Sequence, residues 1–314
     1  IELDEMSQVK QKVVVGLGKT GLSCARFLLQ QGVPVAVTDS RAQPPGLDRL
    51  LKDFPSVTVS VGKFDDDLMV AAEELVVSPG VSLKESAVKK AVESGVPAIG
   101  DIELFCRYLQ ERASASRIIA ITGSNAKSTV TTLVGDMIRQ AGYSVIVAGN
   151  IGLPVMDVLL NSKSVKGESL KGPDADFYVL ELSSFHLETT HTLNAFVATI
   201  LNVSPDHLDR YEGITDYITA KQRIYKGCGI AVVNADDQET YPVAVPAQTP
   251  PKEIVTFSTQ LVLQHALQQA SQKTVSSSVY QCKRVNADEG IYRDDILVIA
   301  INDMVLTGGH NVQN

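Results

Sequence analysis

The sequence predicts an α/β protein of two domains, each built around a mostly parallel sheet. Two segments, one near residue 15 and one near residue 122, pass from a β-branched strand through a short glycine-containing loop into a helix. Most candidate strands are near-continuous apolar runs, which are typical of parallel strands buried on both faces. The 314 residues, 44% of them hydrophobic, are enough for two ordinary cores.

The first α/β pattern begins with a β-branched strand at 13–15. It continues through the turn Gly16-Leu-Gly-Lys-Thr-Gly21 into a helical stretch at 22–29. A second strand at 34–38 ends at Asp39, an acid 18 residues after Gly21. Such a turn presents a helix N-terminus to phosphate, and the acid can bond ribose hydroxyls. We therefore expect a Rossmann-like nucleotide-binding domain, with further strands at 74–77 and 96–99.

The polar stretch 110–116 is the best candidate linker, so we place the first domain at 1–112 and a central domain at 113–306. Apolar runs predict five central strands, at 117–121, 143–147, 177–182, 196–201 and 230–233. Short alternating segments from residue 279 onward, with turns at 288–290 and 302–303, predict a small antiparallel sheet near the C-terminal end.

A phosphate-binding loop is expected where the strand at 117–121 ends. The candidate ATP-binding residues are Gly123, Ser124, Asn125, Ala126, Lys127, Ser128 and Thr129. Lys127 supplies charge for the outer phosphates, and the Ser128 hydroxyl can ligate Mg²⁺. The pattern is not a clean Walker A motif, because Ile121 and Ala126 stand at its two glycine positions. An ordinary strand–turn–helix with an exposed lysine is the alternative interpretation.

Three further residues are candidates for chemistry in the central domain. Glu181 ends a predicted parallel strand, where α/β sheets bind ligands, and its carboxylate suits Mg²⁺. The alternative for Glu181 is a solvated strand-end acid. His207 follows another strand among acidic residues, which favours a ligand role. Lys221 falls on a probable helix, and the residues alone favour a solvated surface lysine there.

Composition limits the class of partner. A net charge of −8 argues against a nucleic-acid-binding surface. The four cysteines are scattered without a CxxC pair, so neither a zinc site nor a disulfide framework is indicated, and the pattern fits a reducing cytoplasm. No apolar run reaches the roughly 20 residues that span a bilayer, so we expect no membrane partner.

Ten ordered motifs together are far more specific than any one of them. They are Gly16–Gly21, Ser78–Gly80, Gly100–Phe105, Thr122–Thr129, Gly149–Gly152, Leu180–Phe185, Leu201–Tyr211, Ala220–Tyr225, Val233–Asp237 and Gly309–Asn311. In this order the motifs resemble the Mur ligases of bacterial cell-wall synthesis. The resemblance is strongest to the branch that adds D-glutamate to UDP-MurNAc-L-Ala.

The resemblance implies an ATP-dependent amide-bond ligase that works with two Mg²⁺ ions. ATP phosphorylates the substrate carboxylate, and the amine of D-glutamate then displaces phosphate from the acyl phosphate. Lys127 would hold the ATP phosphates, while Ser128 and Glu181 would ligate the first Mg²⁺. His207 and a carbamylated Lys221 would serve the second, which replaces the surface interpretation of Lys221. Asn314 would lie near the adenine.

The resemblance also changes the expected ligand of the first domain from NAD to uridine diphosphate. The residues implied in substrate binding are Gly18, Lys19, Thr20, Asp39, Ser40, Arg41, Ser78 and Gly80, together with Asn150 and Ser183. We expect a cytoplasmic monomer. The family has a third domain, so residues 307–314 would begin a linker to it, and the chain alone would bind substrate without ligating it.

Two departures from the family pattern and three rival functions stay open. Ala126 replaces the usual loop glycine, and His186 stands where glutamine is common. An NAD-dependent oxidoreductase would use Gly16–Gly21 and Asp39 but leaves Lys127 and the other charged candidates without a role. A non-catalytic UDP-sugar-binding module is the second rival. The third is a sister ligase for another amino acid or for folate.

Overall fold

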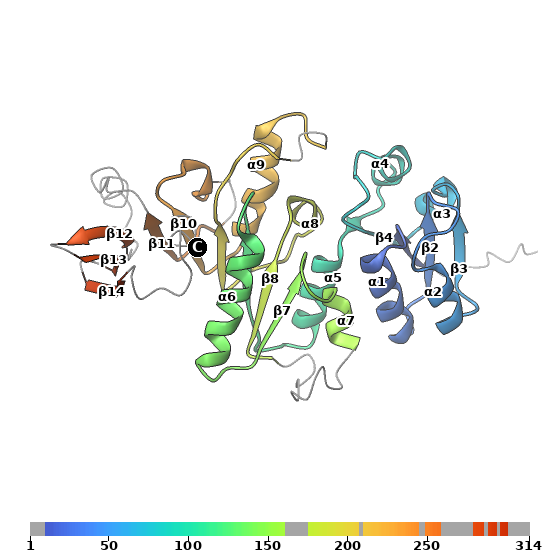
Figure 1. Ribbon diagram of the computed structural model, residues 1–314. Helices are drawn as coiled ribbons and strands as arrows, with labels where there is room; N and C mark the ends of the chain where they lie inside the picture. The colour runs from blue at the N-terminus through green and yellow to red at the C-terminus, as the bar shows by residue number, and fades with distance from the viewer. Residues whose placement is uncertain are drawn as a thin grey trace, which may run out of the picture. The chain divides into compact units, whose positions relative to one another are not determined.

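The computed structural model describes residues 10–160, 175–206, 210–244, 249–258, 279–285, 288–293 and 296–300. The chain divides into two compact units (Figure 1). Unit 1 holds the residues up to 114 together with 152–174 and 189–191, and unit 2 holds the rest. The predicted limit at 306/307 lies outside the described residues.

Unit 1 is built on a five-stranded parallel sheet, which confirms the predicted α/β class for this part of the chain. The strand order is β3-β2-β1-β4-β5, so β1 lies between β2 and β4. Winding therefore reverses beside β1, and such switch points are where open α/β sheets bind ligands. The strands are β1 (Lys12–Val15), β2 (Val35–Asp39), β3 (Thr58–Val61), β4 (Glu74–Val77) and β5 (Ala98–Ile99).

In the described residues of unit 1 the helices are α1 (Lys19–Gln30), α2 (Leu47–Asp53), α3 (Asp66–Val70), α4 (Ser86–Glu93), α5 (Asp101–Glu111) and α7 (Val155–Leu160). The core on one face of the sheet contains fully buried Val13, Met69 and Leu75. At the start of α1 the backbone approaches so closely that a Cβ on Gly21 would lie 1.8 Å from the Gly16 carbonyl oxygen. Glycine is therefore required at position 21.

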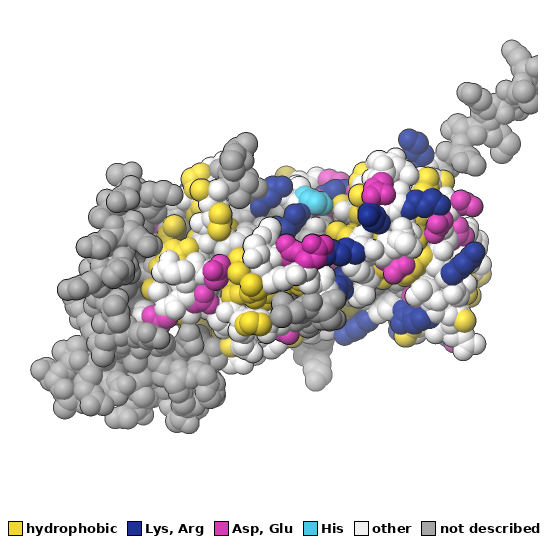
Figure 2. All heavy atoms as spheres, turned by 90° about the horizontal axis from the view of Figure 1, so that it is seen from above, with side chains coloured by type: hydrophobic (Ala, Val, Ile, Leu, Met, Phe, Trp, Pro, Cys, Tyr) yellow, Lys and Arg dark blue, Asp and Glu magenta, His cyan; other side chains and the backbone are white. Residues whose placement is uncertain are grey.

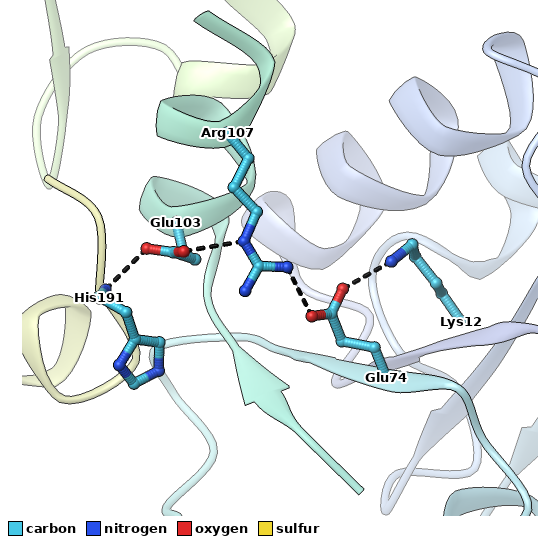
Figure 3. A network of polar contacts seen from close by, with 5 residues as sticks. All are labelled: Lys12, Glu74, Glu103, Arg107 and His191. Carbon is cyan, nitrogen blue, oxygen red and sulfur yellow. Dashed lines mark hydrogen bonds and ion pairs between the residues drawn. The ribbon is translucent and has the colours of Figure 1, made fainter. Parts of the chain in front are cut away.

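A chain of charged contacts ties α5 to the sheet of unit 1 (Figure 3). Glu74 accepts from Lys12 Nζ at 2.6 Å and from Arg107 Nη1 at 2.7 Å. Arg107 Nε donates to Glu103 at 2.8 Å, and Glu103 also accepts from the backbone N–H of His191 at 2.7 Å. The Glu103 side chain is fully buried, so its charge depends on these two donors and on the contacts around them.

Unit 2 contains a nine-stranded sheet in the order β14-β13-β12-β11-β10-β9-β6-β8-β7. The strands β6 to β12, seven in all, pair in parallel, with β6 between β8 and β9. The strands are β6 (Arg117–Thr122), β7 (Val145–Gly149), β8 (Phe177–Glu181), β9 (Val197–Ile200), β10 (Ile230–Asn234), β11 (Glu253–Ser258), β12 (Val279–Val285), β13 (Asp288–Arg293) and β14 (Ile296–Ala300).

The predicted small antiparallel sheet needs correction. Strands β12, β13 and β14 are antiparallel to one another, but β12 also pairs in parallel with β11 through Thr256 and Val279. In the described residues the hairpins therefore extend the edge of the parallel sheet instead of forming a sheet of their own. The sequence pattern showed the hairpins but not the partner of their first strand. The turn predicted at 288–290 is wrong, because these residues belong to β13 and pair with β12. The turn predicted at 302–303 lies outside the described residues.

The helices of unit 2 lie beside the parallel strands (Figure 1). Within the described part of this unit they are α6 (Lys127–Gln140), α8 (Ser184–Glu188), α9 (Ile214–Gln222) and the 3₁₀ turns η2 (Arg223–Tyr225) and η3 (Gln238–Thr240). Helix α6 packs against β7 and β8. Its core neighbours include buried Ile121, Val145 and Val179.

Three thiols are free and buried: Cys24 and Cys106 in unit 1 and Cys228 in unit 2. Burial raises the pKa of each thiol, in the case of Cys228 to about 11. The side chain of Cys282 lies outside the described residues.

The described surface mixes charges of both signs. On the face drawn in Figure 2, lysine and arginine side chains alternate with aspartate and glutamate, without one continuous basic field among the described residues. Among the helices that the structure describes, none combines the length and hydrophobicity needed to cross a bilayer.

Candidate functional site

The loops that follow β6, β8 and β9 emerge at one edge of the unit 2 sheet. Ile121 of β6 is in register with Glu181 of β8 and with Thr199 of β9. Because the three strands run in parallel, the loop at 123–126, Glu181 and the segment from Leu201 all follow their carboxyl ends. This is the edge at which open α/β sheets bind ligands.

The loop between β6 and α6 has two unusual backbone conformations. Gly123 has φ 157°, and a Cβ there would lie 3.1 Å from Cβ of Leu201. Ala126, the N-cap residue of α6, has φ 65° and ψ 0°, which is the left-handed region. A residue with a Cβ loses about 1–2 kcal/mol in that region. The methyl group of Ala126 therefore stands where the loop favours glycine.

Side chains from the segment after β9 hold this loop. The Asn202 carboxamide oxygen accepts from the backbone N–H groups of Ser124 at 3.1 Å and Asn125 at 2.8 Å. Ser124 Oγ donates to the Ser204 carbonyl at 2.9 Å and accepts from the Ser204 N–H at 2.9 Å. The loop is thus fixed before any ligand arrives, which lowers the cost of ordering it on binding.

Two lysine amines converge on one carbonyl oxygen. Lys127 Nζ donates to Gly123 O at 2.9 Å and to Ser124 O at 2.9 Å. Lys221 Nζ, from α9, donates to the same Gly123 O at 2.9 Å. The ion pairs found among the described residues include neither lysine. This arrangement leaves a positive site beside the loop that suits an anionic ligand.

Lys221 is not a surface residue. It is 2% exposed, so the interpretation favoured by the residues alone is wrong. Burial, and then the charge of Lys127, lowers the pKa of the Lys221 amine to about 7, with Asp206 acting in the opposite direction. The amine also lies 4.4 Å from the centre of the Tyr217 ring. The Lys221 amine therefore loses its proton more readily than the amine of an exposed lysine does.

Glu181 is a buried carboxylate, and one of its two oxygens has no hydrogen-bond partner. It is 1% exposed, and its Oε1 accepts from the Asn150 carboxamide at 2.8 Å. Its Oε2 is buried without a hydrogen-bond partner. A buried carboxylate oxygen without a partner is costly unless a donor or cation completes it. The donor set thus fits a hard divalent cation.

The backbone around Glu181 restricts its neighbour in β7. Gly149 has φ 103°, and a Cβ there would lie 2.3 Å from the Glu181 carbonyl oxygen. Ser183, two residues after Glu181, is half-buried, directly precedes α8 and contacts His186 within that helix.

Some predicted residues are not brought to this site by the described structure. His207 and Asn314 lie outside the described residues. Ser128 and Thr129 directly follow Lys127 on the first turn of α6, beside the loop, and both are exposed. Within the described part of the chain no group of three or more His, Cys, Asp or Glu residues could hold a metal ion. Of the four residues predicted as metal ligands, Ser128, Glu181 and Lys221 lie in the described part of the chain, and Glu181 is the carboxylate among them.

In unit 1, Asp39 ends β2 and its carboxylate is fully engaged. It accepts from the backbone N–H of Leu17 at 2.6 Å and of Arg41 at 2.8 Å. The Arg41 guanidinium adds Nε at 2.9 Å and Nη2 at 2.6 Å. Despite opposing desolvation by burial, the hydrogen bonds from Arg41 and Leu17 lower the pKa of Asp39. A carboxylate has about four acceptor sites, so a ribose hydroxyl would have to displace a donor.

The other predicted substrate residues of unit 1 surround the same turn. Ser78 Oγ donates to Gly16 O at 2.7 Å and so braces the glycine turn. Lys19 is exposed on the first turn of α1, after the N-cap residue Gly18, and its Nζ donates to Gly152 O at 3.0 Å. Thr20 is partly buried there, while Ser40 and Gly80 are exposed after β2 and β4.

Comparison with known proteins identifies the family. Residues 121–314 match the family described as the Mur ligase middle domain, and residues 10–100 match the MurD-like Mur ligase N-terminal domain.

The chain belongs to the Mur ligase family.

Two relatives of this Mur ligase carry the name UDP-N-acetylmuramoylalanine–D-glutamate ligase. The protein from Marinobacter nauticus is 52% identical over 235 residues, which cover 75% of this chain and 49% of that protein. The one from Coxiella burnetii is 42% identical over 309 residues, covering 98% of this chain and 62% of that protein. This chain therefore spans about half to three fifths of the length of the relatives it matches.

A solved structure supports the fold of this Mur ligase. UDP-N-acetylmuramate:L-alanyl-gamma-D-glutamyl-meso-diaminopimelate ligase from Neisseria meningitides superposes with a TM-score of 0.53. The alignment covers 97% of this chain and 90% of that one at 16% sequence identity. At this identity the likeness concerns the fold alone.

Sequence reasoning missed three residues that build the site of this Mur ligase. Asn202 and Ser204 hold the loop, and Tyr217 packs under Lys221 while its hydroxyl lies 3.1 Å from Ser124 Oγ. Asn202 and Ser204 belong to the motif Leu201–Tyr211 after β9, but their role depends on contacts with a loop about 80 residues earlier in the sequence, which the motif itself does not show. Tyr217 precedes Lys221 by four residues, a helical spacing that could have indicated the contact.

Proposed function

We propose that this chain provides the UDP-sugar-binding and ATP-binding parts of a ligase that joins D-glutamate to UDP-MurNAc-L-Ala in peptidoglycan precursor synthesis. The two relatives that bear this activity in their names are 52% and 42% identical to it. In this reaction the substrate carboxylate accepts the terminal phosphoryl group of ATP. The amine of D-glutamate then forms the amide bond as phosphate leaves.

The observation that carries the proposal is the meeting of two lysine amines at Gly123 O, on the sheet edge where Glu181 also ends its strand. Lys127 holds the terminal phosphates of the nucleotide. The free backbone N–H groups at the start of α6 add donors for the same oxygens. Within this proposal the ATP-contacting residues are 123–129, and Asn314 lies near the adenine.

The Oε2 atom of Glu181, which has no hydrogen-bond partner, supports a Mg²⁺ site that the Ser128 hydroxyl would complete. A second ion would be held by His207 and by Lys221 as its carbamate. Bound Mg²⁺ would neutralise negative charge on the phosphoryl group that is transferred. Glu181 keeps its orientation through Asn150, which donates to its other oxygen.

Carbamylation of Lys221 is chemically accessible because the amine pKa is about 7. The neutral amine forms a bond from Nζ to the carbon of CO₂ and releases a proton, which turns a cation into an anionic oxygen ligand. The contact of Nζ with Gly123 O belongs to the unmodified amine. We expect a carbamate signal after addition of ¹³C-bicarbonate that is absent from Lys221→Met. Its absence from the unsubstituted chain in the presence of Mg²⁺ and nucleotide would exclude the modification.

We propose that unit 1 binds the uridine diphosphate part of the substrate. The residues are Gly18, Lys19, Thr20, Asp39, Ser40, Arg41, Ser78 and Gly80, with Asn150 and Ser183 for the rest of the UDP-sugar. The engaged carboxylate of Asp39 supports a role in holding Arg41 and weighs against the ribose contact of NAD enzymes. Domain limits at 112/113 and 306/307, a monomeric state and a cytoplasmic location complete the proposal.

Calorimetric titration of the chain tests both binding functions. We expect UDP-MurNAc-L-Ala and Mg²⁺–ATP to bind and NADH not to bind. Lys127→Ala should weaken ATP binding by about tenfold or more, because it removes a charged hydrogen-bond donor worth about 1.5–3 kcal/mol. Lys226→Ala, at an exposed lysine of unit 2, is the matched control. Binding of NADH but not of UDP-MurNAc-L-Ala would refute the proposal.

We propose the ligase activity for a full-length protein that contains these residues, because the relatives with this activity in their names are longer than the chain. In an assay of that protein, we expect release of ADP that depends on both UDP-MurNAc-L-Ala and D-glutamate. Release with another amino acid in place of D-glutamate would assign a sister activity.

A further inference from the structure

Ser183 and His186 form a hydrogen-bonded pair that follows the proposed metal ligand Glu181 in the sequence. Ser183 Oγ lies 2.7 Å from His186 Nδ1, and the backbone N–H of Ser183 donates to the same nitrogen at 3.2 Å. His186 is 4% exposed, whereas Ser183 is half-buried. One partner is thus accessible to a ligand and the other is enclosed by the fold.

The geometry determines which imidazole nitrogen carries the proton. A backbone N–H can only donate, so the Nδ1 atom that receives it must be unprotonated. The imidazole proton of neutral His186 is therefore on Nε2. The hydroxyl of Ser183 then donates to Nδ1, and the nitrogen shares its lone pair between the two donors.

This pairing fixes the polarity of Ser183. Its only hydrogen is directed to His186, and its oxygen also receives the backbone N–H of His186 at 3.3 Å. One lone pair of the hydroxyl oxygen remains for a ligand. A free serine can donate or accept by rotating its hydroxyl, but this one can only accept.

We propose that His186 is a positioning residue that makes the Ser183 hydroxyl an obligate acceptor, so that Ser183 recognises an N–H or O–H group of the substrate. This inference rests on the proposed function. In a UDP-sugar that bears an amino acid, the matching groups are an amide N–H or a sugar hydroxyl. Phosphate and carboxylate oxygens present only lone pairs, so Ser183 disfavours them.

The first test is spectroscopic and needs no ligand. The chain labelled with ¹⁵N-histidine is examined by long-range ¹H–¹⁵N correlation, with His186→Asn to assign the resonances. We expect Nδ1 of His186 to have the shift of an unprotonated nitrogen and Nε2 that of a protonated one. In Ser183→Ala the Nδ1 resonance should move, because its hydroxyl donor is lost. A protonated Nδ1 at neutral pH would overturn the proposal.

The second test measures binding of UDP-MurNAc-L-Ala by calorimetry. Ser183→Ala and His186→Leu should each weaken binding by about three- to tenfold, the loss of one neutral hydrogen bond. The double variant should bind no more weakly than either single one, because both remove the same interaction. His186→Asn retains an acceptor at the position of Nδ1 and should recover most of the affinity. His191→Leu, at an exposed histidine, is the matched control.

Each outcome decides one claim. Multiplied losses in the double variant, or full affinity in a folded His186→Leu, would overturn the positioning role. If His186→Leu does not fold, the comparison of His186→Asn with Ser183→Ala and the tautomer measurement still decide it. If the unsubstituted chain does not bind UDP-MurNAc-L-Ala, the proposed function and the ligand assignment fall together. The tautomer result then shows separately whether the Ser183–His186 pair exists.

Discussion

At the scale of single residues, two side chains occupy positions that cost the folded state free energy. Ala126 adopts a left-handed backbone at the head of α6, and Lys221 keeps an amine in a buried setting beside a second amine. Strain and unfavourable burial of this kind cluster at functional sites, where the surrounding structure enforces them. Both residues contact the loop that follows β6, so the cost is concentrated where the nucleotide is proposed to bind.

Replacing Ala126 with glycine should stabilise the protein slightly. The left-handed conformation costs alanine about 1–2 kcal/mol, while the greater freedom of glycine in the unfolded chain returns about 0.5–1 kcal/mol of that. We expect a gain of about 1 kcal/mol or less in the free energy of unfolding, measured by urea denaturation. Ala141→Gly, at the other end of α6 with φ −73°, should destabilise instead. A lower free energy of unfolding in Ala126→Gly would contradict the claim that the left-handed backbone of Ala126 is strained.

Lys221 should make stability depend on pH in a defined window. Between pH about 7 and 10.5, its folded and ordinary pKa values, the unfolded chain holds a proton that the folded chain lacks. The free energy of unfolding therefore rises with pH across this window, by on the order of 1 kcal/mol per unit. Below pH 7 both states are protonated, and the full cost of burial remains.

The comparison with Lys221→Met isolates this slope. In CO₂-free buffer, the stability of the unsubstituted chain minus that of the variant should increase from pH 7 toward pH 10. Lys226→Met, at an exposed lysine, provides the matched comparison. Parallel stability curves for the unsubstituted chain and Lys221→Met would show that the amine titrates at its ordinary pKa.

At the scale of elements, charged side chains fasten α5 to β4 in unit 1 (Figure 3). Arg107 is central because it bridges two carboxylates whose side chains are 7% and 0% exposed, Glu74 and Glu103. Lys12, the other cation, contacts only Glu74 and lies at the edge of the network. Removing the central cation leaves buried negative charge, which costs more than the loss of a surface pair.

Arg107→Met should therefore lower the free energy of unfolding by about 2–3 kcal/mol, somewhat less than for a fully buried pair because Arg107 is partly exposed. Lys12→Met should cost about 1 kcal/mol or less. Both are measured by chemical denaturation at neutral pH. The combination Arg107→Met with Glu103→Gln should recover part of the loss. Equal effects of the two single variants would show that Arg107 is not central.

The elements that sequence patterns predicted well are the buried ones. Strands β1, β6 and β8 have continuous apolar runs, and the glycine turn and phosphate loop mark the helices that follow. Strand β3 was not predicted, because it is an edge strand whose residues are exposed or half-buried and its pattern lacks an apolar run. The pairing of β12 with β11 depends on tertiary contacts that no local pattern encodes.

The candidate site follows the same division. The loop, Lys127 and Glu181 were predicted because strand ends in parallel sheets are where ligands bind. Burial of Lys221 could not be read from its helix alone, since it depends on Tyr217 and the loop carbonyls around it. The sequence also did not predict that Arg41 occupies the Asp39 carboxylate with hydrogen bonds, although the two residues are only two positions apart.

At the scale of the whole molecule, the chain consists of two units, each with its own sheet and core. Leu75 in β4 of unit 1 and Leu180 in β8 of unit 2 are both fully buried. Domains of this kind can unfold independently, so a single free energy of unfolding need not describe the chain. The two family matches follow this division in the main, because residues 10–100 lie in unit 1 and most of residues 121–314 lie in unit 2.

We expect Leu75→Ala and Leu180→Ala to act on different units. Each should cost about 2–5 kcal/mol by leaving a cavity in one core. Hydrogen exchange read by mass spectrometry should show faster opening of β1 and β2 amides in Leu75→Ala, and of β6 and β8 amides in Leu180→Ala. Equal acceleration in both units by either variant would indicate a single cooperative unit.

The reactivity of the buried thiols reports local unfolding of the protein. A thiolate is the reactive form, and burial suppresses it at Cys24, Cys106 and Cys228. Alkylating reagents therefore label these sulfurs only after the surrounding segment opens. Because the first two report from unit 1 and the third from unit 2, peptide-resolved labelling in living cells could follow the integrity of each part without any introduced tag.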